Sequence, residues 1–294
     1  MKSTSLLELA RWRDEGPRFS YANQSIFYRD QGSGPALLCI HGFPTASWDW
    51  HAVWPALTAR FRVIAPDLIG FGYSAKPIDY EYSINDQATL VETLARALGV
   101  TRAHVLAHDY GDTVAQELLA RHAERQRRGE AGLELASICL LNGGLFPETH
   151  RPRLVQRLLL GPLGPVVGGL MNERRFARSF AALFGARTQP SADQLAALWS
   201  LVASDAGTRI AHKLIRYMVE RRRHRARWVG ALATATVPLL LIDGMADPVS
   251  GAHMVARYRE LIPRPQVVAL DEIGHYPQLE APDEVTRAFL RFVG

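Results

Sequence analysis

Short apolar runs alternate along this chain with longer segments in which apolar residues recur at helical spacing. The runs are typical of buried strands and occupy residues 36–40, 62–65, 103–107, 135–141, 237–242 and 266–270, with an outer strand at 25–29. Helical spacing marks residues 84–98, the segment after 110, and the segments near 251–262 and from about 283, whereas residues 1–20 suit a lead-in helix or a loose arm. This alternation predicts an α/β fold, in which helices cover both faces of a mostly parallel sheet.

The strand pattern stops between residues 144 and 230, where the sequence is helical except for a hinge-like stretch rich in glycine and proline at 161–169. A helical block placed between two strands of one sheet is most simply a lid over the carboxyl ends of those strands. We therefore expect a core domain made of residues 1–143 and 231–294, and a helical lid (cap) domain made of residues 144–230. The polar stretch 121–132 suits a surface connection.

The sharpest motif joins the strand at 103–107 to the helix that follows it. Its sequence, Ala107-His108-Asp109-Tyr110-Gly111, has a small residue two positions before and two positions after an aspartate. A tight turn from strand to helix crowds the backbone at those two positions and pushes the central side chain out at the carboxyl edge of the sheet, where enzymes with this turn carry their nucleophile. Asp109 is therefore the candidate nucleophile. The alternative is that it only caps the following helix.

A nucleophile of this kind needs a histidine and an acid, and both follow the last two predicted strands as Asp247 and His275. The carboxyl ends of parallel strands meet at one edge of the sheet, and the order nucleophile, acid, histidine is the one that this turn accompanies. Asp243 is the competing acid, but it lies closer to its strand and is expected to be structural. The preceding strand ends in Asn142, which offers no carboxylate.

Two backbone N–H groups complete the candidate site. Phe43 follows His41-Gly42 at a strand end, so its N–H can point into the site. With the N–H of Tyr110 it is expected to form an oxyanion hole. We expect His41 to be structural, bonded to nearby loop backbone, and His108 to be a packed side chain beside the nucleophile.

Aspartate in place of serine decides the chemistry of such a site. Serine attacks a carbonyl carbon, whereas a carboxylate in that reaction would give an anhydride. Against a saturated carbon with a strained or good leaving group, as in epoxides and alkyl halides, a carboxylate forms an alkyl ester on the enzyme. His275, oriented by Asp247, would then remove a proton from the water that hydrolyses the Asp109 ester. This chemistry needs no cofactor, and metal-site spacing is absent from the sequence.

The leaving group needs its own help. An opening epoxide leaves an alkoxide that needs a proton, and Tyr217 is the only tyrosine in the expected lid. It belongs to an apolar stripe at helical spacing with Ile210, Leu214 and Met218. That stripe should face the sheet and the pocket, while the charged residues 220–223 fall largely elsewhere. The alternative is that Tyr217 is only packed in the lid core.

These residues resemble the epoxide hydrolase and haloalkane dehalogenase branch of the α/β-hydrolase superfamily over nearly the whole chain after residue 25. Within the branch, the chain looks most like the subgroup of the mesoderm-specific transcript protein and its bacterial relatives, on the segments 41–45, 108–112, 142–152, 227–232 and 275–280. The resemblance implies a hydrolase with Asp109, Asp247 and His275 as its triad. Dehalogenases usually place tryptophan after the nucleophile and a donor such as asparagine after the His-Gly pair. Tyr110 and Phe43 stand there instead, which favours epoxide opening.

Two departures from the family bear on the substrate. Epoxide hydrolases generally have two proton donors in the lid, so His150 or His212 is the candidate for the second donor beside Tyr217. Fluoroacetate dehalogenases carry arginine where this chain has Tyr110, which disfavours small haloacids. We expect a hydrolase that opens an epoxide to a vicinal diol through an alkyl-enzyme ester. The alternatives are a haloalkane dehalogenase and, from another class, a binding or scaffolding protein that retains the triad with little turnover.

Composition and charge give expectations for the cellular location of the protein and for its partners. The chain has neither a signal-peptide pattern nor an apolar stretch long enough for a membrane span, and Cys39 and Cys139 lie in apolar strands, so we expect a cytoplasmic protein. The net charge of +5 is uneven, because residues 144–230 hold fifteen Lys or Arg against five Asp or Glu. This basic face either contacts an anionic surface or is solvated, and the solvated face is expected. The expected partners are a small apolar epoxide-type substrate and water, without nucleic acid.

Overall fold

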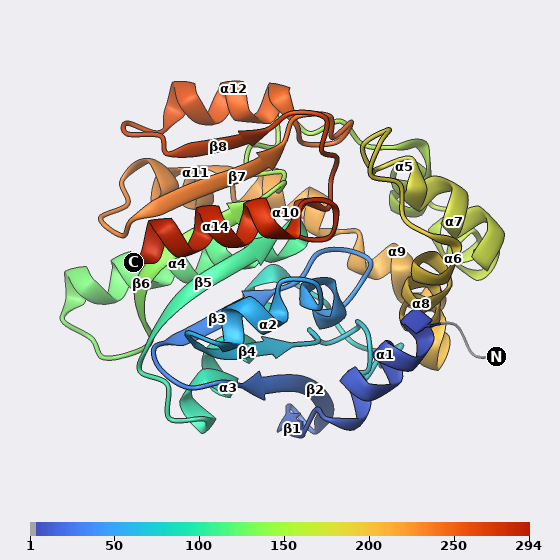
Figure 1. Ribbon diagram of the computed structural model, residues 1–294, viewed down its shortest axis with the longest axis horizontal. Helices are drawn as coiled ribbons and strands as arrows, with labels where there is room; N and C mark the ends of the chain where they lie inside the picture. The colour runs from blue at the N-terminus through green and yellow to red at the C-terminus, as the bar shows by residue number, and fades with distance from the viewer. Residues whose placement is uncertain (1–3) are drawn as a thin grey trace.

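An eight-stranded sheet forms the centre of the computed structural model, which describes residues 4–294 (Figure 1). The strands are β1 (Arg18–Tyr21), β2 (Gln24–Gln31), β3 (Ala36–Ile40), β4 (Arg62–Pro66), β5 (Arg102–His108), β6 (Glu134–Leu141), β7 (Leu239–Gly244) and β8 (Val267–Leu270). Their order across the sheet is β1-β2-β4-β3-β5-β6-β7-β8. β2 pairs antiparallel with β1 and β4, and the other neighbours are parallel. The predicted mostly parallel α/β sheet is confirmed.

Helices lie on both faces of this sheet and beyond one of its ends (Figure 1). Those of the two faces and the site loops are α1 (Thr4–Asp14), the 3₁₀ helix η1 (Ser47–Trp50), α2 (Trp54–Thr58), α3 (Ile84–Ala97), α4 (Tyr110–Arg128), α12 (Ala252–Leu261), α13 (Pro277–Glu280) and α14 (Pro282–Val293). None of the helices formed by residues 4–294 combines the length and the apolar character that crossing a bilayer requires.

The chain between β6 and β7, all of which the structure describes, contains helices and loops but no strand. We call its helices the inserted helices: α5 (Leu154–Leu160), α6 (Gly164–Gly169), α7 (Glu173–Ala181), α8 (Ala192–Ala203), the 3₁₀ helix η2 (Ser204–Ile210), α9 (Ala211–Leu214), α10 (Tyr217–Arg223) and α11 (Arg225–Ala233). Figure 1 shows α5 to α9 gathered beyond one end of the sheet. α11 instead packs against α4.

Alternate side chains of each central strand divide the core into two layers. On β3, Leu38 and Ile40 belong to the layer formed with α3, α4, α11 and α12. Leu37 and Cys39 belong to the layer formed with α1, α2 and α14. Both layers consist of nearly water-free side chains, which explains why the strands read as continuous apolar runs in the sequence.

Two predictions about loops are wrong. Residues 164–169 of the hinge-like stretch form α6, because Pro165 lies in the first turn, where a missing N–H costs no helical hydrogen bond. The predicted surface connection at 121–132 is mostly the end of α4, which continues to Arg128 and stops at Gly129 in the left-handed conformation, with φ of +65°.

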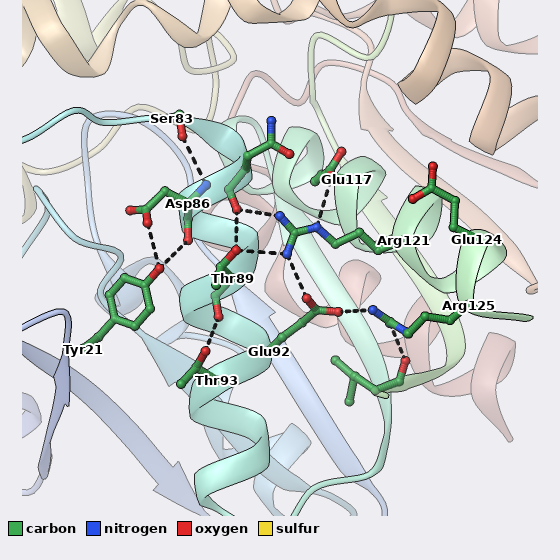
Figure 2. Close-up of polar contacts among 12 residues, drawn as sticks. Tyr21, Ser83, Asp86, Thr89, Glu92, Thr93, Glu117, Arg121, Glu124 and Arg125 are labelled. Atoms are coloured by element: carbon green, nitrogen blue, oxygen red, sulfur yellow. Dashed lines mark hydrogen bonds and ion pairs between the residues drawn. The ribbon is translucent and has the colours of Figure 1, made fainter. Parts of the chain in front are cut away.

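Ion pairs explain why the polar stretch stays helical. Figure 2 shows Arg121 bound to Glu92 of α3 at 2.8 Å and to Glu117 of its own helix at 2.9 Å. Arg125 Nη1 donates to the other carboxylate oxygen of Glu92 at 2.6 Å. Glu117 also accepts the indole N–H of Trp228 from α11 at 2.8 Å. These contacts fix α4, the helix that directly follows Asp109, between α3 and α11.

Candidate active site

Asp109 is the single residue between β5 and α4, and its backbone has φ of +45° and ψ of −101°. A non-glycine residue adopts positive φ only when its surroundings hold it there. The turn also brings Gly111 so close to β3 that a β-carbon there would lie 2.2 Å from the carbonyl oxygen of Ile40. Asp109 occupies the N-cap position of α4, yet its side chain makes no capping hydrogen bond. The structure therefore contradicts the alternative that Asp109 only caps the helix.

The Asp109 carboxylate is buried between one backbone donor and one cation. Its Oδ2 accepts the N–H of Phe43 at 3.2 Å, and its Oδ1 lies 3.5 Å from Nη2 of Arg221. Burial by itself raises the pKa of this carboxyl group, but the charges of His275 and Arg221 and the Phe43 hydrogen bond outweigh burial, so the pKa lies below its ordinary value. Asp109 is ionised at neutral pH, as a nucleophile must be.

Asp247 and His275, from the loops after β7 and β8, form a direct pair. Nδ1 of His275 lies 2.7 Å from Oδ2 of Asp247. The same oxygen accepts Nδ2 of Asn142 at 3.0 Å and the hydroxyl of Ser250 at 2.8 Å, while Oδ1 accepts the N–H of Val249 at 2.7 Å. Burial raises the pKa of Asp247, but His275 and these donors outweigh burial and lower it to about 2.

The pKa of His275 depends on both carboxylates. Burial lowers this pKa, but Asp247 first and then Asp109 raise it, and the balance lies at about 9. The imidazole is therefore protonated at neutral pH while Asp109 is charged. Its availability as a base is coupled to the charge state of Asp109.

A single cavity joins Asp109 and His275. Its walls are mostly apolar and come largely from the inserted helices α5, α7, α8 and α9, with Leu159, Phe176, Phe180 and Leu214 among them. The cations Lys76 and Arg153 also line it. No group of three or more His, Cys, Asp or Glu that could hold a metal ion occurs within residues 4–294.

The structure places the second predicted N–H donor, that of Tyr110, at the first position of α4. The first four N–H groups of a helix have no acceptor within it, so this N–H is available at the same edge of the sheet as that of Phe43. The Tyr110 ring packs against Phe71 at 5.2 Å between centroids and against Tyr217 at 4.9 Å.

Tyr217, the predicted proton donor, is the first residue of α10 and is 1% exposed. Its ring lies 6.0 Å from that of Phe43, which lines the cavity, but Tyr217 is not itself among the lining residues that the structure describes. Its hydroxyl has no hydrogen-bond partner in the described chain. Burial and the charge of Asp109 raise the pKa of Tyr217, so the hydroxyl keeps its proton.

Arg221 is the functional candidate that the sequence did not reveal. The residue is 2% exposed, and its guanidinium donates from Nη2 to the backbone oxygen of Asp109 at 2.9 Å and from Nε to Thr113 Oγ1 at 2.7 Å. It also lies over the ring of Tyr217, 4.5 Å from the centroid. Continuous helical spacing from residue 210 predicts that residues 220–223 lie largely away from the apolar face of the helix. In the structure, α9 ends at Leu214 and a new helix begins at Tyr217, and spacing alone does not show this break.

The other histidines divide into structural and unpaired ones. His41 accepts the N–H of Leu68 at 3.0 Å, as expected of a side chain bonded to loop backbone. His108 lies 2.7 Å from the backbone oxygen of His275 and so helps fix the loop that carries it. His150 is partly exposed, but both of its ring nitrogens are buried and unpaired, and burial followed by the nearby charge of Arg221 lowers its pKa to about 3. Neither His150 nor His212 lines the cavity in the described chain.

Asp243 and Asn142, which the sequence did not favour as the acid of the triad, also have defined positions. Asp243 lies within β7, and burial followed by the charge of Asp247 raises its pKa well above the ordinary value. A buried carboxyl group within a strand fits the structural role predicted for it. Asn142, discounted because it is not an acid, instead bonds to Asp247 and accepts the N–H of Gly244 at 2.8 Å.

Known proteins share this architecture and sequence. A family model of the α/β hydrolase fold matches residues 35–129. The human mesoderm-specific transcript homolog protein is 44% identical, over 97% of this chain and 88% of its own length. The chain belongs to the α/β-hydrolase superfamily. This α/β hydrolase is also 39% identical to the putative hydrolase LipZ of Mycobacterium tuberculosis, over 99% of this chain and 98% of that protein.

A solved structure extends the likeness to the fold. The epoxide hydrolase CorEH superimposes on this α/β hydrolase with a TM-score of 0.78, covering 94% of this chain and 97% of that one. The two sequences are 20% identical, so the likeness concerns the fold. In this chain, Asp109 at the turn and His275, which is paired with Asp247, line the same cavity.

Proposed function

We propose that this α/β hydrolase opens an epoxide to a vicinal diol, with Asp109 as the nucleophile and an alkyl ester of Asp109 as the intermediate. The observation that carries the proposal is the ionised carboxylate at the turn, which lines a mostly apolar cavity and accepts the N–H of Phe43. A carboxylate suits attack on strained saturated carbon rather than on a carbonyl group.

In the first step, Oδ1 of Asp109 attacks an epoxide carbon. The bond from that carbon to the epoxide oxygen breaks, and the oxygen takes a proton as the ester forms. Tyr217 is the proposed donor, because its buried hydroxyl is protonated and unpaired, beside the rings of Phe43 and Tyr110. His150 and His212 are the alternatives for a second donor.

Formation of the ester activates His275 for the second step. The charge of Asp109 is one of the causes that raise the pKa of His275, and the ester is neutral, so alkylation lowers that pKa. His275 then loses its proton to solvent. A proton from solvent in turn restores the hydroxyl of Tyr217, which gave its own proton to the epoxide oxygen. The neutral imidazole, held by Asp247, then takes a proton from water as the water attacks Cγ of the ester.

The N–H groups of Phe43 and Tyr110 stabilise the tetrahedral oxyanion at Oδ2. The intermediate collapses when the diol oxygen leaves and takes the proton from His275. The new carboxyl group gives its remaining proton to His275, so Asp109 is a carboxylate again, with one oxygen derived from water, and His275 is protonated as at the start. Such positioned acid–base groups contribute about 10²–10⁴-fold each to the rate.

The remaining assignments follow from the same arrangement. We propose that residues 144–230 act as the lid of a core made of residues 1–143 and 231–294, because the inserted helices supply most of the cavity wall. We propose a cytoplasmic location, because Cys39 and Cys139 are both buried free thiols.

A substrate panel tests the proposed reaction. The wild type is incubated with styrene oxide and with 1-bromobutane, and diol and bromide are measured. The proposal predicts diol from the epoxide, no release of bromide, and no diol from Asp109→Ala. Bromide release without diol would replace the proposal with dehalogenation, and diol from Asp109→Ala would remove Asp109 from the reaction. Inertness of the wild type toward both panels would favour a binding protein.

A further inference from the structure

Exposed apolar side chains concentrate on two neighbouring inserted helices. Five of the eight large apolar residues that are exposed in the described chain lie between residues 154 and 170. We call them the α5–α6 patch; its members, with their exposed fractions, are Leu154 (71%), Leu158 (45%), Leu163 (64%), Val166 (57%) and Leu170 (60%). The other three are scattered singly, as is normal for a soluble surface. A cluster of this kind marks a surface that another apolar phase covers.

The backbone explains why these side chains point outward. α6 lies so close to its neighbours that a β-carbon at Gly164 would be 2.2 Å from the carbonyl oxygen of Leu159, and one at Gly168 would be 2.5 Å from that of Thr208. Glycine therefore occupies the points where α6 comes closest to its neighbours; Val167 packs partly against the core, whereas Val166 is exposed. On α5, Leu154 and Leu158 are four residues apart and share one face.

The segment of the chain that carries the patch is positively charged. Residues 151–178 contain six arginines and one glutamate, and no lysine or aspartate, a net charge of +5. Arg151, Arg157, Arg174, Arg175 and Arg178 are exposed. Among residues 4–294, none of these five forms an ion pair with an acidic side chain, so their charge is available to a partner.

We propose that the α5–α6 patch binds the surface of an anionic lipid bilayer, with its apolar side chains at the level of the headgroups and acyl chains and its arginines on the headgroups. Apolar residues beside arginine are the composition of helices that lie in a membrane interface. Charge argues against a second copy of this chain, because a two-fold contact would bring two patches of the same sign together. The surface is thus specific for an anionic and apolar partner.

The position of α5 gives this contact a consequence. Leu154 and Leu158 are exposed, whereas Val155, Gln156 and Leu159 of the same helix line the cavity that contains Asp109. One short helix therefore separates the proposed bilayer surface from the cavity. The proposed contact would therefore hold the cavity of the proposed hydrolase one helix away from the bilayer.

Vesicle binding by the full chain tests the proposal. The probes are vesicles of equal parts phosphatidylcholine and phosphatidylserine, and vesicles of phosphatidylcholine alone, with co-sedimentation as the readout. We expect binding to the anionic vesicles alone, weakening steeply as salt rises past physiological strength, where screening acts over ~8 Å. The double variant Leu163→Gln/Leu170→Gln should bind about tenfold or more weakly. Arg157→Gln/Arg174→Gln should bind roughly 30-fold more weakly, since each basic residue near such a surface contributes about fivefold.

Matched controls keep the experiment decisive. Ile78→Gln/Val219→Gln removes exposed apolar residues elsewhere, and Arg222→Gln/Arg223→Gln removes the same charge from exposed positions of α10. Both should bind within twofold of the wild type, and melting temperatures should show that all variants are folded. Failure of the wild type to bind, equal loss in the control variants, or binding that ignores salt would overturn the proposal. So would light scattering that shows a wild-type dimer abolished by Leu163→Gln/Leu170→Gln.

Discussion

The guanidinium of Arg221 donates a hydrogen bond to the backbone oxygen of Asp109 at 2.9 Å and lies 3.5 Å from its carboxylate. One inserted helix thus supplies a cation to the turn that carries the proposed nucleophile. Both side chains are almost completely buried, so little solvent screens their interaction. The pKa of Asp109 and the position of α10 therefore depend on each other.

Replacing Arg221 should change the pH dependence of the first step. Burial raises the pKa of Asp109 and Arg221 helps to lower it, so Arg221→Met should move the acid limb of the alkylation rate to higher pH. Arg221→Lys keeps the charge and should restore most of that limb, while Arg222→Met, at an exposed neighbour, should leave it in place. Single-turnover rates between about pH 3 and 8 make the measurement, because the wild-type limb lies below the ordinary pKa of an aspartate. Identical acid limbs for Arg221→Met and wild type would show that Arg221 only packs.

The coupling between His275 and Asp109 should be visible without substrate. The pKa of His275 lies at about 9, with Asp109 among the groups that raise it. Asp109→Asn removes that negative charge and keeps the shape, so the pKa of His275 should fall, as it does in the proposed ester. Histidine proton resonances followed by NMR against pH give both values. An unchanged or higher pKa in Asp109→Asn would remove the proposed switch of His275 from acid to base.

Tyr217→Phe separates proton donation from packing, because it retains the ring and removes the hydroxyl. If the hydroxyl protonates the epoxide oxygen, alkylation of Asp109 should slow by ~10²-fold or more. Hydrolysis of the ester should change little, since Tyr217 has no part in activating water. Single-turnover kinetics resolve the two steps. An unaltered alkylation rate would assign Tyr217 to packing and leave His150, His212 or Tyr110 as the donor.

Glu117 should be important for stability rather than for chemistry. Its carboxylate is nearly buried and bonds to Arg121, Arg227 and Trp228. Glu117→Gln removes the buried carboxylate that Arg121 and Arg227 share and leaves them only their partly exposed partners Glu92 and Glu124, so we expect a loss of ~2–3 kcal/mol in the free energy of unfolding. Glu284→Gln, in an exposed pair with Arg287, should change it by less than ~1 kcal/mol. Urea denaturation compares the two. Equal effects would mean that the network around Glu117 adds no stability.

The elements that depend on local pattern could be predicted, because their cause lies in neighbouring residues. The buried strands have apolar side chains on both faces, and the turn at Asp109 needs Gly111 where the chain passes β3 at van der Waals distance. Asp247 and His275 were found because the ends of parallel strands meet at one edge of the sheet. The fold and the neighbourhood of the site could therefore be predicted from the sequence.

Features that depend on contacts between distant parts of the chain could not be predicted from the sequence. Arg221 looked like a solvated charge because its partner, Asp109, is 112 residues away. The polar end of α4 looked like a loop because Glu92 and Glu117, which pair with its arginines, act only in the folded chain. Asn142 was discounted by its residue type, although its amide bonds to Asp247. In each case, a polar side chain finds its role through a contact that spacing does not encode.

The covalent intermediate is the central claim, and the mass of His275→Gln after mixing with styrene oxide tests it most directly. This variant retains Asp109 and Arg221 but lacks the base for the second step, so it should be alkylated and then stall. Intact-mass spectrometry should find the protein heavier by one molecule of styrene oxide, and peptide mapping should locate the addition at Asp109. Asp109→Ala should gain no mass. Turnover of the epoxide by the wild type, together with no adduct on His275→Gln, would contradict the mechanism.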